Sequence, residues 1–210
     1  MNHNRKLFPS AVRVRSRGYL PHWERDRSFY SVTIRLADSL PREAARKLTE
    51  ERKALLNAAR QEGRVSVTDR FDIDRLLELS TDRELDRGLD SCSLGRTPVA
   101  QIVWNAILYF NQDRYEVDTF CIMPNHVHVL FYLAVGRDLA DVMRSWKSFT
   151  SKEALKVTGG AAPFWQEEYF DRLIRDGDDL NGTRRYIREN PVKAGLRDWK
   201  WIYEAGSSRQ

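Results

Sequence analysis

Two histidines separated by a single residue, His126 and His128, are the side chains of this 210-residue chain that best suit binding of a divalent metal ion. They lie in the apolar stretch TFCIMPNHVHVLFY, residues 119–132, whose bulky and β-branched residues favour a strand over a helix. Residues two apart on a strand project to the same side, so both imidazoles would face one surface with their Cα atoms roughly 7 Å apart. The spacing alone is equally compatible with a metal site and with the polar face of a half-buried strand.

A tyrosine and an asparagine form a second candidate pair about sixty residues further along. Tyr186 and Asn190 are one helical turn apart in a segment of helical character, so their side chains are neighbours. The phenol can attack a phosphodiester, and the amide oxygen can complete the coordination of a metal ion. The same residues also suit a packed tyrosine and a helix that stops before Pro191. Taken alone, the segment favours that structural explanation.

A sheet and a helix must bring the two pairs together, and the sequence predicts both. Strands are expected at 29–36, 115–123, 126–134 and 164–174, with the middle two joined as a tight hairpin at Pro124 and Asn125. Helices are expected at 39–62, 97–110, 138–156 and 179–190, the last ended by Pro191. The order condenses to βαββαβ followed by a terminal helix. We therefore expect an α+β fold, a ferredoxin-like (RRM-like) antiparallel sheet with a C-terminal helix that carries the catalytic groups.

Charge and length suggest how the chain is divided. Residues 1–28 form a basic arm, 29–203 the main domain and 204–210 a tail, while the strongly charged residues 64–95 are interpreted as an insertion or irregular connection. Net charge is +5, from 35 basic and 30 acidic residues, and in residues 1–27 basic residues outnumber acidic ones seven to two. Such an arm would attract polyanions, or it could simply be a solubilising tail.

Several classes of protein are disfavoured by the composition. No apolar run approaches the ~20 residues of a membrane-spanning helix, and the first residues lack the apolar core of a signal peptide. Two cysteines do not make a disulfide framework. We therefore expect a cytoplasmic protein without a membrane partner.

Taken together, the motifs resemble the single-tyrosine HUH transposases, and in particular their REP-associated branch. The shared motifs are Met-Pro-Asn followed by His-Val-His, then SWKSFT and FWQEEYFDRLIRD, then Tyr-Ile-x-x-Asn-Pro-Val-Lys-Ala-Gly, in that order. RGYLPHWE and FYSVTIRLADSLP near the start are also similar to that branch. The resemblance extends roughly from Arg17 to Trp201 and is weakest in residues 64–95.

The resemblance implies a role for each candidate residue. His126 and His128 match the HUH pair, which implies ligands of Mg²⁺ or Mn²⁺. Tyr186 matches the catalytic tyrosine, which attacks single-stranded DNA and leaves a 5′-phosphotyrosine link and a free 3′-hydroxyl. Asn190 matches the polar residue that completes the metal site. The implied activity is metal-dependent cleavage and transfer of single-stranded DNA at hairpin-forming repeats, by a monomer or a homodimer.

Basic residues near these motifs are the candidates for contacts with DNA, because single-strand binding surfaces interleave positive charge with aromatic rings. They are Arg13, Arg15, Arg17, Lys147, Lys152, Arg184, Arg185 and Arg188. Some of these arginines could instead pair with nearby acidic residues, and Trp146 and Cys121 are expected to be buried. Two other functions stay open: a hairpin-binding regulator without catalysis, and a metal-dependent phosphodiesterase in which water attacks. The sequence shows no obvious general base.

Overall fold

A computed structural model describes most of the chain. It covers residues 13–17, 20–24, 27–40, 42–61 and 91–206, together with 73, 76–77, 80–82 and 84–85. The elements are β1 (Arg13–Arg17), β2 (Leu20–Glu24), β3 (Phe29–Arg35), α1 (Arg42–Gln61), the 3-10 helix η1 (Ser93–Gly95), α3 (Thr97–Tyr109), β4 (Tyr115–Ile122), β5 (His126–Leu133), α4 (Leu139–Thr158), β6 (Phe170–Leu173), α5 (Gly177–Lys193) and β7 (Ile202–Glu204). Among these described helices, none has the length and apolar character needed to cross a membrane.

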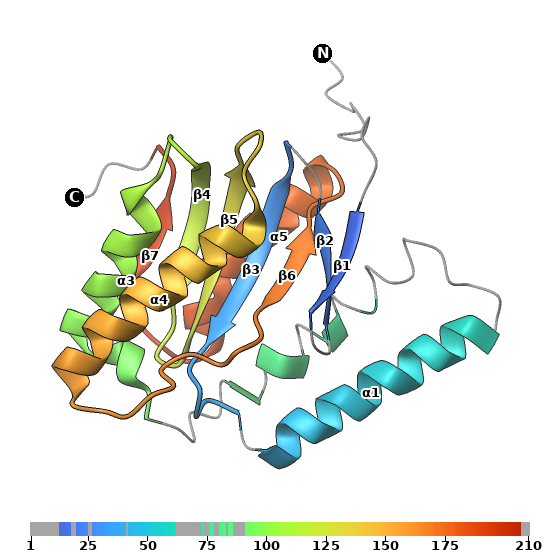
Figure 1. The fold of residues 1–210 in the computed structure, drawn as a ribbon, viewed down its shortest axis with the longest axis horizontal. Coiled ribbons are helices and arrows are strands. Elements are labelled where there is room, and N and C mark those ends of the chain that lie inside the picture. The colour runs from blue at the N-terminus through green and yellow to red at the C-terminus, as the bar shows by residue number, and fades with distance from the viewer. Residues whose placement is uncertain are drawn as a thin grey trace.

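The main sheet has five antiparallel strands in the order β6-β3-β5-β4-β7. The strands β3, β4, β5 and β6, with α3 and α4 as the connecting helices, make the expected ferredoxin-like βαββαβ unit, and the predicted fold class is confirmed. β5 lies in the middle of this unit, between β3 and β4 (Figure 1). β7 was not predicted, because three residues carry too short a pattern to reveal a strand.

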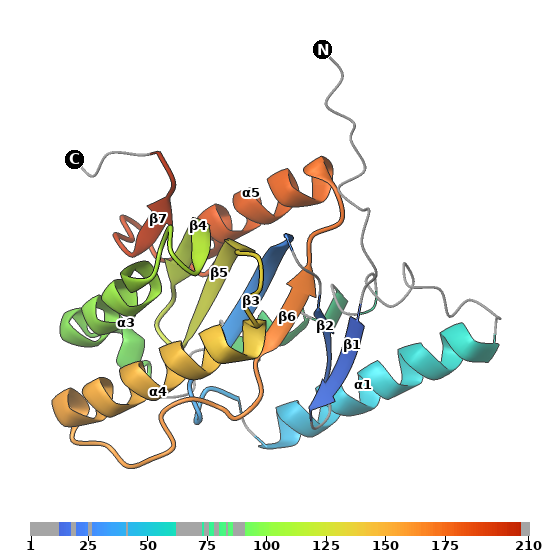
Figure 2. The same cartoon turned by 45° about the horizontal axis from the view of Figure 1, so that its top comes forward.

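Helices cover both faces of the sheet (Figures 1 and 2). α3 and α4 pack on one face, where Val127 and Val129 of β5 join the large apolar core. α5 packs on the opposite face, where Leu130 of β5 and Ile187 of α5 belong to a smaller cluster. The period-two alternation of β5 therefore directs valines to one layer and histidines to the other, as the sequence predicted.

Two predicted boundaries are wrong. The expected strand 164–174 pairs regularly only at Phe170–Leu173, since the carbonyl oxygens of Gln166 and Glu167 accept hydrogen bonds from Lys147 Nζ, 2.6 and 2.5 Å away. Pro191 does not end the last helix, which continues to Lys193. Proline cannot donate a backbone hydrogen bond, but the next turn is still closed by the Ala194 N–H on the Asn190 carbonyl, at 3.0 Å.

The region between β3 and α3 is partly helical. α1 extends away from the sheet (Figure 1), and the described residues between 73 and 85 are helical, with Ile73, Leu77 and Leu85 buried. The described residues of 64–95 thus include helical residues that pack into the domain, and the insertion or irregular connection stays a prediction. Residues 1–12 and 207–210 lie outside the described residues, and β1 and β2 form a separate two-stranded antiparallel pair within the predicted basic arm.

Candidate active site

His126 and His128 lie side by side under α5. They occupy the first and third positions of β5, directly after the turn at Pro124 and Asn125. Their Nε2 atoms are 3.0 Å apart, and the side chains are 1% and 0% exposed. Two ring nitrogens that approach each other this closely, away from solvent, have the arrangement of ligands that converge on one point.

The outer ring nitrogen of each histidine has a partner that fixes the ring. His126 Nδ1 lies 2.7 Å from Asn125 Oδ1, and the Asn125 amide is itself held because its Nδ2 donates to the Leu85 carbonyl at 2.8 Å. Since Oδ1 can only accept, His126 donates through Nδ1 and keeps the Nε2 lone pair directed into the site. His128 Nδ1 lies 2.8 Å from Thr33 Oγ1 on the neighbouring strand.

Burial keeps both imidazoles neutral. It lowers the pKa of His128 to about 3. The pKa of His126 also falls well below its ordinary value, mainly through burial and further through electrostatic interaction with His128 and Arg35. Neutral imidazole is the form that binds metal ions.

A carboxylate completes a possible metal-binding group. Asp82 is 5% exposed, and its Oδ2 atom lies 3.7 Å from His128 Nε2. One ligand atom from each of Asp82, His126 and His128 lies within 4.8 Å of the others. The sequence did not single out Asp82, because it is one of several acidic residues in 64–95 and no local spacing distinguishes it from them. Only its burial against the histidines does so.

α5 brings the tyrosine and the asparagine to the same place. The Tyr186 hydroxyl donates a hydrogen bond to Asp82 Oδ2, and its ring centroid is 5.7 Å from that of His128. Asn190 is buried, with Nδ2 3.3 Å from His128 Nε2. The structure thus unites the four residues that the sequence analysis selected from two distant segments.

The site fits a divalent ion on its own geometry. Asn190 Oδ1 is buried, and no residue in the described part of the chain donates a hydrogen bond to it. A half-turn of the amide would exchange its nitrogen and oxygen and direct that oxygen towards His128. Two imidazole nitrogens, an amide oxygen and a carboxylate are a mixed donor set that accepts Mn²⁺ and, less readily, Mg²⁺.

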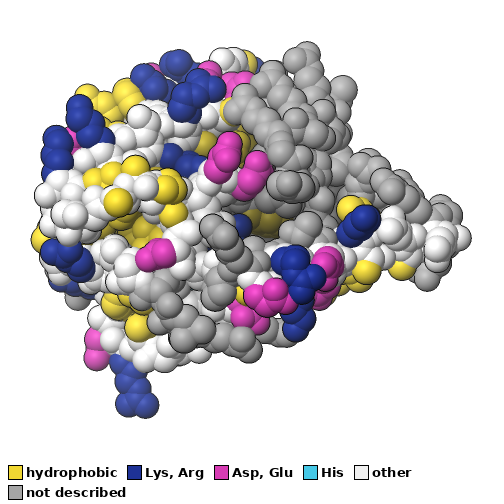
Figure 3. Space-filling view, turned by 60° about the horizontal axis from the view of Figure 1, so that its bottom comes forward, with side chains coloured by type: hydrophobic (Ala, Val, Ile, Leu, Met, Phe, Trp, Pro, Cys, Tyr) yellow, Lys and Arg dark blue, Asp and Glu magenta, His cyan; other side chains and the backbone are white. Residues whose placement is uncertain are grey.

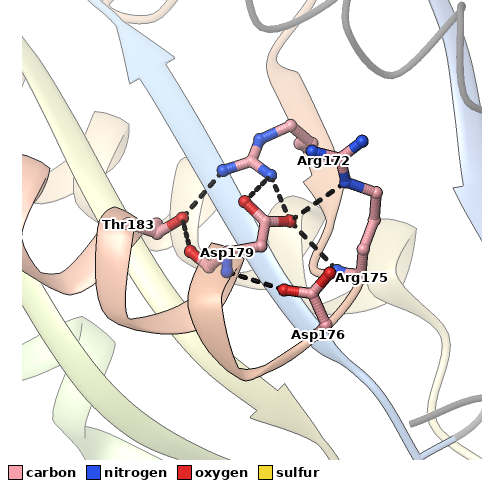
Figure 4. Close-up of polar contacts among 5 residues, drawn as sticks. All are labelled: Arg172, Arg175, Asp176, Asp179 and Thr183. Atoms are coloured by element: carbon pink, nitrogen blue, oxygen red, sulfur yellow. Dashed lines mark hydrogen bonds and ion pairs between the residues drawn. The ribbon is translucent and has the colours of Figure 1, made fainter. Parts of the chain in front are cut away.

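A buried ion pair holds α5 in position over the sheet (Figure 4). Arg172 of β6 donates from Nη1 to both carboxylate oxygens of Asp179, at 2.7 and 2.8 Å, and from Nη2 to Thr183 Oγ1 at 2.8 Å. The backbone N–H of Arg175 also donates to Asp179, at 3.0 Å, and Asp176 caps the helix. Thr183 lies one turn and Asp179 two turns before Tyr186 on α5, so this network fixes the helix that carries the tyrosine.

The basic residues predicted to contact DNA occupy different parts of the molecule. Arg185 and Arg188 are exposed on α5, while Arg184 is paired with Asp118 through Nε, at 2.8 Å, and Nη2. Lys147 and Lys152 belong to α4, on the face of the sheet opposite to the histidines. Arg13, Arg15 and Arg17 are in β1, where the structure describes only the backbone. The structure therefore places only the α5 arginines on the helix of the candidate site.

The surface agrees with the burial of the histidines. In the space-filling view of Figure 3, Lys and Arg side chains lie around the described part of the face, and acidic side chains flank a central hollow. The described surface in this view shows no histidine colour, in line with the exposures of 1% and 0%. Trp146 and Cys121 are buried, as expected, and burial raises the pKa of the Cys121 thiol well above its ordinary value.

Comparison with known proteins identifies relatives in one group. Residues 99–190 match the family described as "Transposase IS200 like", a span that begins in α3 and ends at Asn190. The REP-associated tyrosine transposase of Escherichia coli (strain K12) is 29% identical over 104 residues, which is 47% of this chain and 61% of that protein. A putative REP-associated tyrosine transposase of Haemophilus influenzae is 29% identical over 101 residues, 41% of this chain and 57% of that protein. The chain thus spans about three fifths of the curated relatives that it matches.

A solved structure shares the fold. The structure of a REP-associated tyrosine transposase bound to a REP hairpin superposes with a TM-score of 0.51, at 20% sequence identity, over 90% of this chain and 80% of that one. The resemblance to REP-associated tyrosine transposases that the motifs predicted is confirmed.

Proposed function

This chain contains a transposase IS200-like segment and resembles the REP-associated tyrosine transposases, and on that premise we propose that it cleaves and rejoins single-stranded DNA at hairpin-forming repeats. The observation that carries the proposal is the meeting of Tyr186, Asp82 and His128 in one buried site: the phenol hydroxyl is bonded to a carboxylate that lies 3.7 Å from an imidazole. All of these residues belong to one chain.

In the proposed reaction, Tyr186 is the nucleophile. Its oxygen forms a bond to phosphorus, the bond from phosphorus to the 3′-oxygen breaks, and the downstream strand stays on the enzyme as a 5′-phosphotyrosine. A free phenol has a pKa of about 10, so it needs a proton acceptor at neutral pH. Asp82 accepts the hydroxyl hydrogen bond and is placed to take that proton, while the departing 3′-oxygen takes a proton from solvent. The general base that the sequence did not reveal is therefore assigned to Asp82.

The ligands for a divalent ion would be the Nε2 atoms of His126 and His128, the amide oxygen of Asn190 and a carboxylate oxygen of Asp82. When bound, Mg²⁺ or Mn²⁺ would polarise the phosphate and stabilise the charge that develops on it. Oδ2 of Asp82 both accepts the phenol hydrogen bond and lies 3.7 Å from His128 Nε2, so the carboxylate would have to turn to bind an ion through one oxygen and accept the phenol proton through the other. Because the 5′-phosphotyrosine retains the energy of the broken ester, a 3′-hydroxyl can reverse the step without ATP.

The test is a denaturing gel with a hairpin oligonucleotide that carries single-stranded flanks, drawn from repeats beside the gene. Wild-type protein with Mn²⁺ should convert a 3′-labelled strand into a protein-linked band, and a 5′-labelled strand into a shorter free product. EDTA and Tyr186→Phe should each abolish both. Tyr109→Phe is the matched control, because Tyr109 is 77% exposed at the end of α3.

The remaining functions give different results on the same gel. Cleavage without a linked band, unchanged in Tyr186→Phe, would show that water attacks and that the protein is a phosphodiesterase. Retardation on a native gel with no cleavage would leave a hairpin-binding regulator.

A further inference from the structure

Arg35 shares the sheet face of the histidines. It is the last residue of β3 and lies directly opposite His126 in the antiparallel pairing, as Thr33 lies opposite His128. Directly opposed residues of an antiparallel pair project to the same side. The side chain of Arg35 therefore leaves the sheet on the same side as the His126 imidazole, next to the candidate site.

The guanidinium group of Arg35 has unused hydrogen-bonding capacity. Its Nε atom is buried, and within the described part of the chain nothing accepts its hydrogen bond. Arginine carries five N–H donors in a planar fork, and a buried donor left without an acceptor is costly. The Nε donor is thus desolvated without an acceptor in the described part of the chain.

The charges around Arg35 suit an anion that binds between cations. Burial lowers the pKa of its guanidinium, while Asp82 and Glu168 raise it, and the positive charge of Arg35 in turn contributes to the lowered pKa of His126. A divalent ion at the histidines would add a second positive charge close to this one. Two neighbouring cations repel each other unless an anion lies between them. A phosphodiester shares one negative charge over two free oxygens, so one oxygen can face each cation.

We infer that Arg35 binds a backbone phosphate of the DNA, at or next to the linkage that Tyr186 attacks. This inference rests on the proposed function for the identity of the anion. The planar fork of arginine matches two oxygens of one phosphate, and the unused Nε supplies one of the two parallel bonds. Arg35 was not among the basic residues that the sequence suggested for DNA contacts, since nothing local separates it from the other arginines.

The experiment removes one phosphate charge at a time. The hairpin oligonucleotide is synthesised with a single neutral methylphosphonate at each linkage of its single-stranded flank in turn. Affinity is measured by fluorescence anisotropy in the non-cleaving Tyr186→Phe background, alone and combined with Arg35→Gln. At one linkage, neutralisation should reduce the DNA affinity of the Tyr186→Phe parent by about 10- to 100-fold, the usual effect of losing a charged hydrogen bond. The same neutralisation should have almost no effect on the affinity of the variant that also carries Arg35→Gln.

Two further variants interpret the result. Arg35→Lys keeps the positive charge but lacks the planar fork of N–H donors, so it should retain part of the affinity loss at that linkage. This variant also tests the inference if Arg35→Gln fails to fold. Arg137→Gln is the control, because Arg137 follows β5 at the end of the strand remote from His126 and is 46% exposed. Arg137→Gln should leave unchanged the loss of DNA affinity that neutralising that linkage causes.

A structural role for Arg35 would look different. If Arg35 only balances Asp82 and Glu168, Arg35→Gln would reduce the affinity for every oligonucleotide by the same factor. Neutralising a linkage would then still reduce the affinity of Arg35→Gln as much as it reduces that of the parent, and the inference would be wrong. Coupling at a linkage more than one position from the site of the phosphotyrosine bond would also overturn it. The scan needs no cleavage, so failure of wild-type protein to form the adduct refutes the proposed function and leaves the coupling measurable.

Discussion

Replacing Asp179 by asparagine tests whether the buried ion pair holds α5 in place. Asp179→Asn keeps the shape of the side chain and removes its charge, which leaves the Arg172 guanidinium, whose side chain is 6% exposed, without the carboxylate that now receives two of its hydrogen bonds. Removal of one partner from a buried pair costs about 3–5 kcal/mol. For a chain of this size, that cost lowers the melting temperature by roughly 6–20 °C.

Asp141→Asn is the matched control. Asp141 also pairs with an arginine at 2.7 Å, but both side chains of that pair are 66% exposed. Exposed pairs contribute about 0–1 kcal/mol. Urea unfolding followed by circular dichroism gives both free energies, and a loss in Asp179→Asn within about 1 kcal/mol of the control would refute the reasoning.

Acid should remove the same contribution from the wild-type protein. Burial opposes ionisation of Asp179, but the charge of Arg172 and the hydrogen bonds from Arg175 and Arg172 hold the pKa of its carboxyl below the ordinary value. A group with a lowered folded-state pKa stabilises the protein above its unfolded value of about 4 and loses that effect as the pH falls through the folded value. The difference between wild type and Asp179→Asn should therefore narrow below about pH 4.

The ion pair should also matter for catalysis. At a temperature where Asp179→Asn is still folded, adduct formation should slow by about tenfold or more, because even a small misplacement of a nucleophile strongly reduces the reaction rate. Substituting both partners, Arg172→Met with Asp179→Leu, should recover most of the stability, since no charge is then buried alone. If the double variant is as unstable as Asp179→Asn, the cost lies in packing instead of charge.

Two other predictions concern the metal and the thiols. Asp82→Asn should weaken Mn²⁺ binding by roughly 10- to 100-fold, as measured by electron paramagnetic resonance without DNA. Asp113→Asn changes an exposed carboxylate and should leave the affinity unchanged. If both variants bind Mn²⁺ equally well, Asp82 is not a ligand. In the folded protein, a thiol reagent should label Cys92, which is partly exposed, and should label Cys121 only after unfolding, because burial raises the Cys121 pKa and blocks access. Rapid labelling of both cysteines, followed by mass spectrometry, would contradict the packing beside the histidines.

Local periodicity was enough to find the parts of the candidate site. The alternation at 126–134 predicted the strand and the shared side of His126 and His128, and the four-residue spacing of Tyr186 and Asn190 predicted neighbours on one helix. Both patterns depend only on backbone geometry within one element, so sequence reveals them directly. The roles assigned to these residues stay predictions until the gel and the metal titrations are done.

The tertiary structure decided which distant residues join them. Asp82 and Arg35 reach the site because a helical segment packs against β5 and because β3 pairs with β5 in one particular register. The pair of Arg172 with Asp179 depends in the same way on how β6 meets α5. Such contacts follow from the order of strands and the packing of helices, which no local spacing encodes. An acidic or basic residue that sequence cannot distinguish from its neighbours acquires a role only when folding buries it beside a partner.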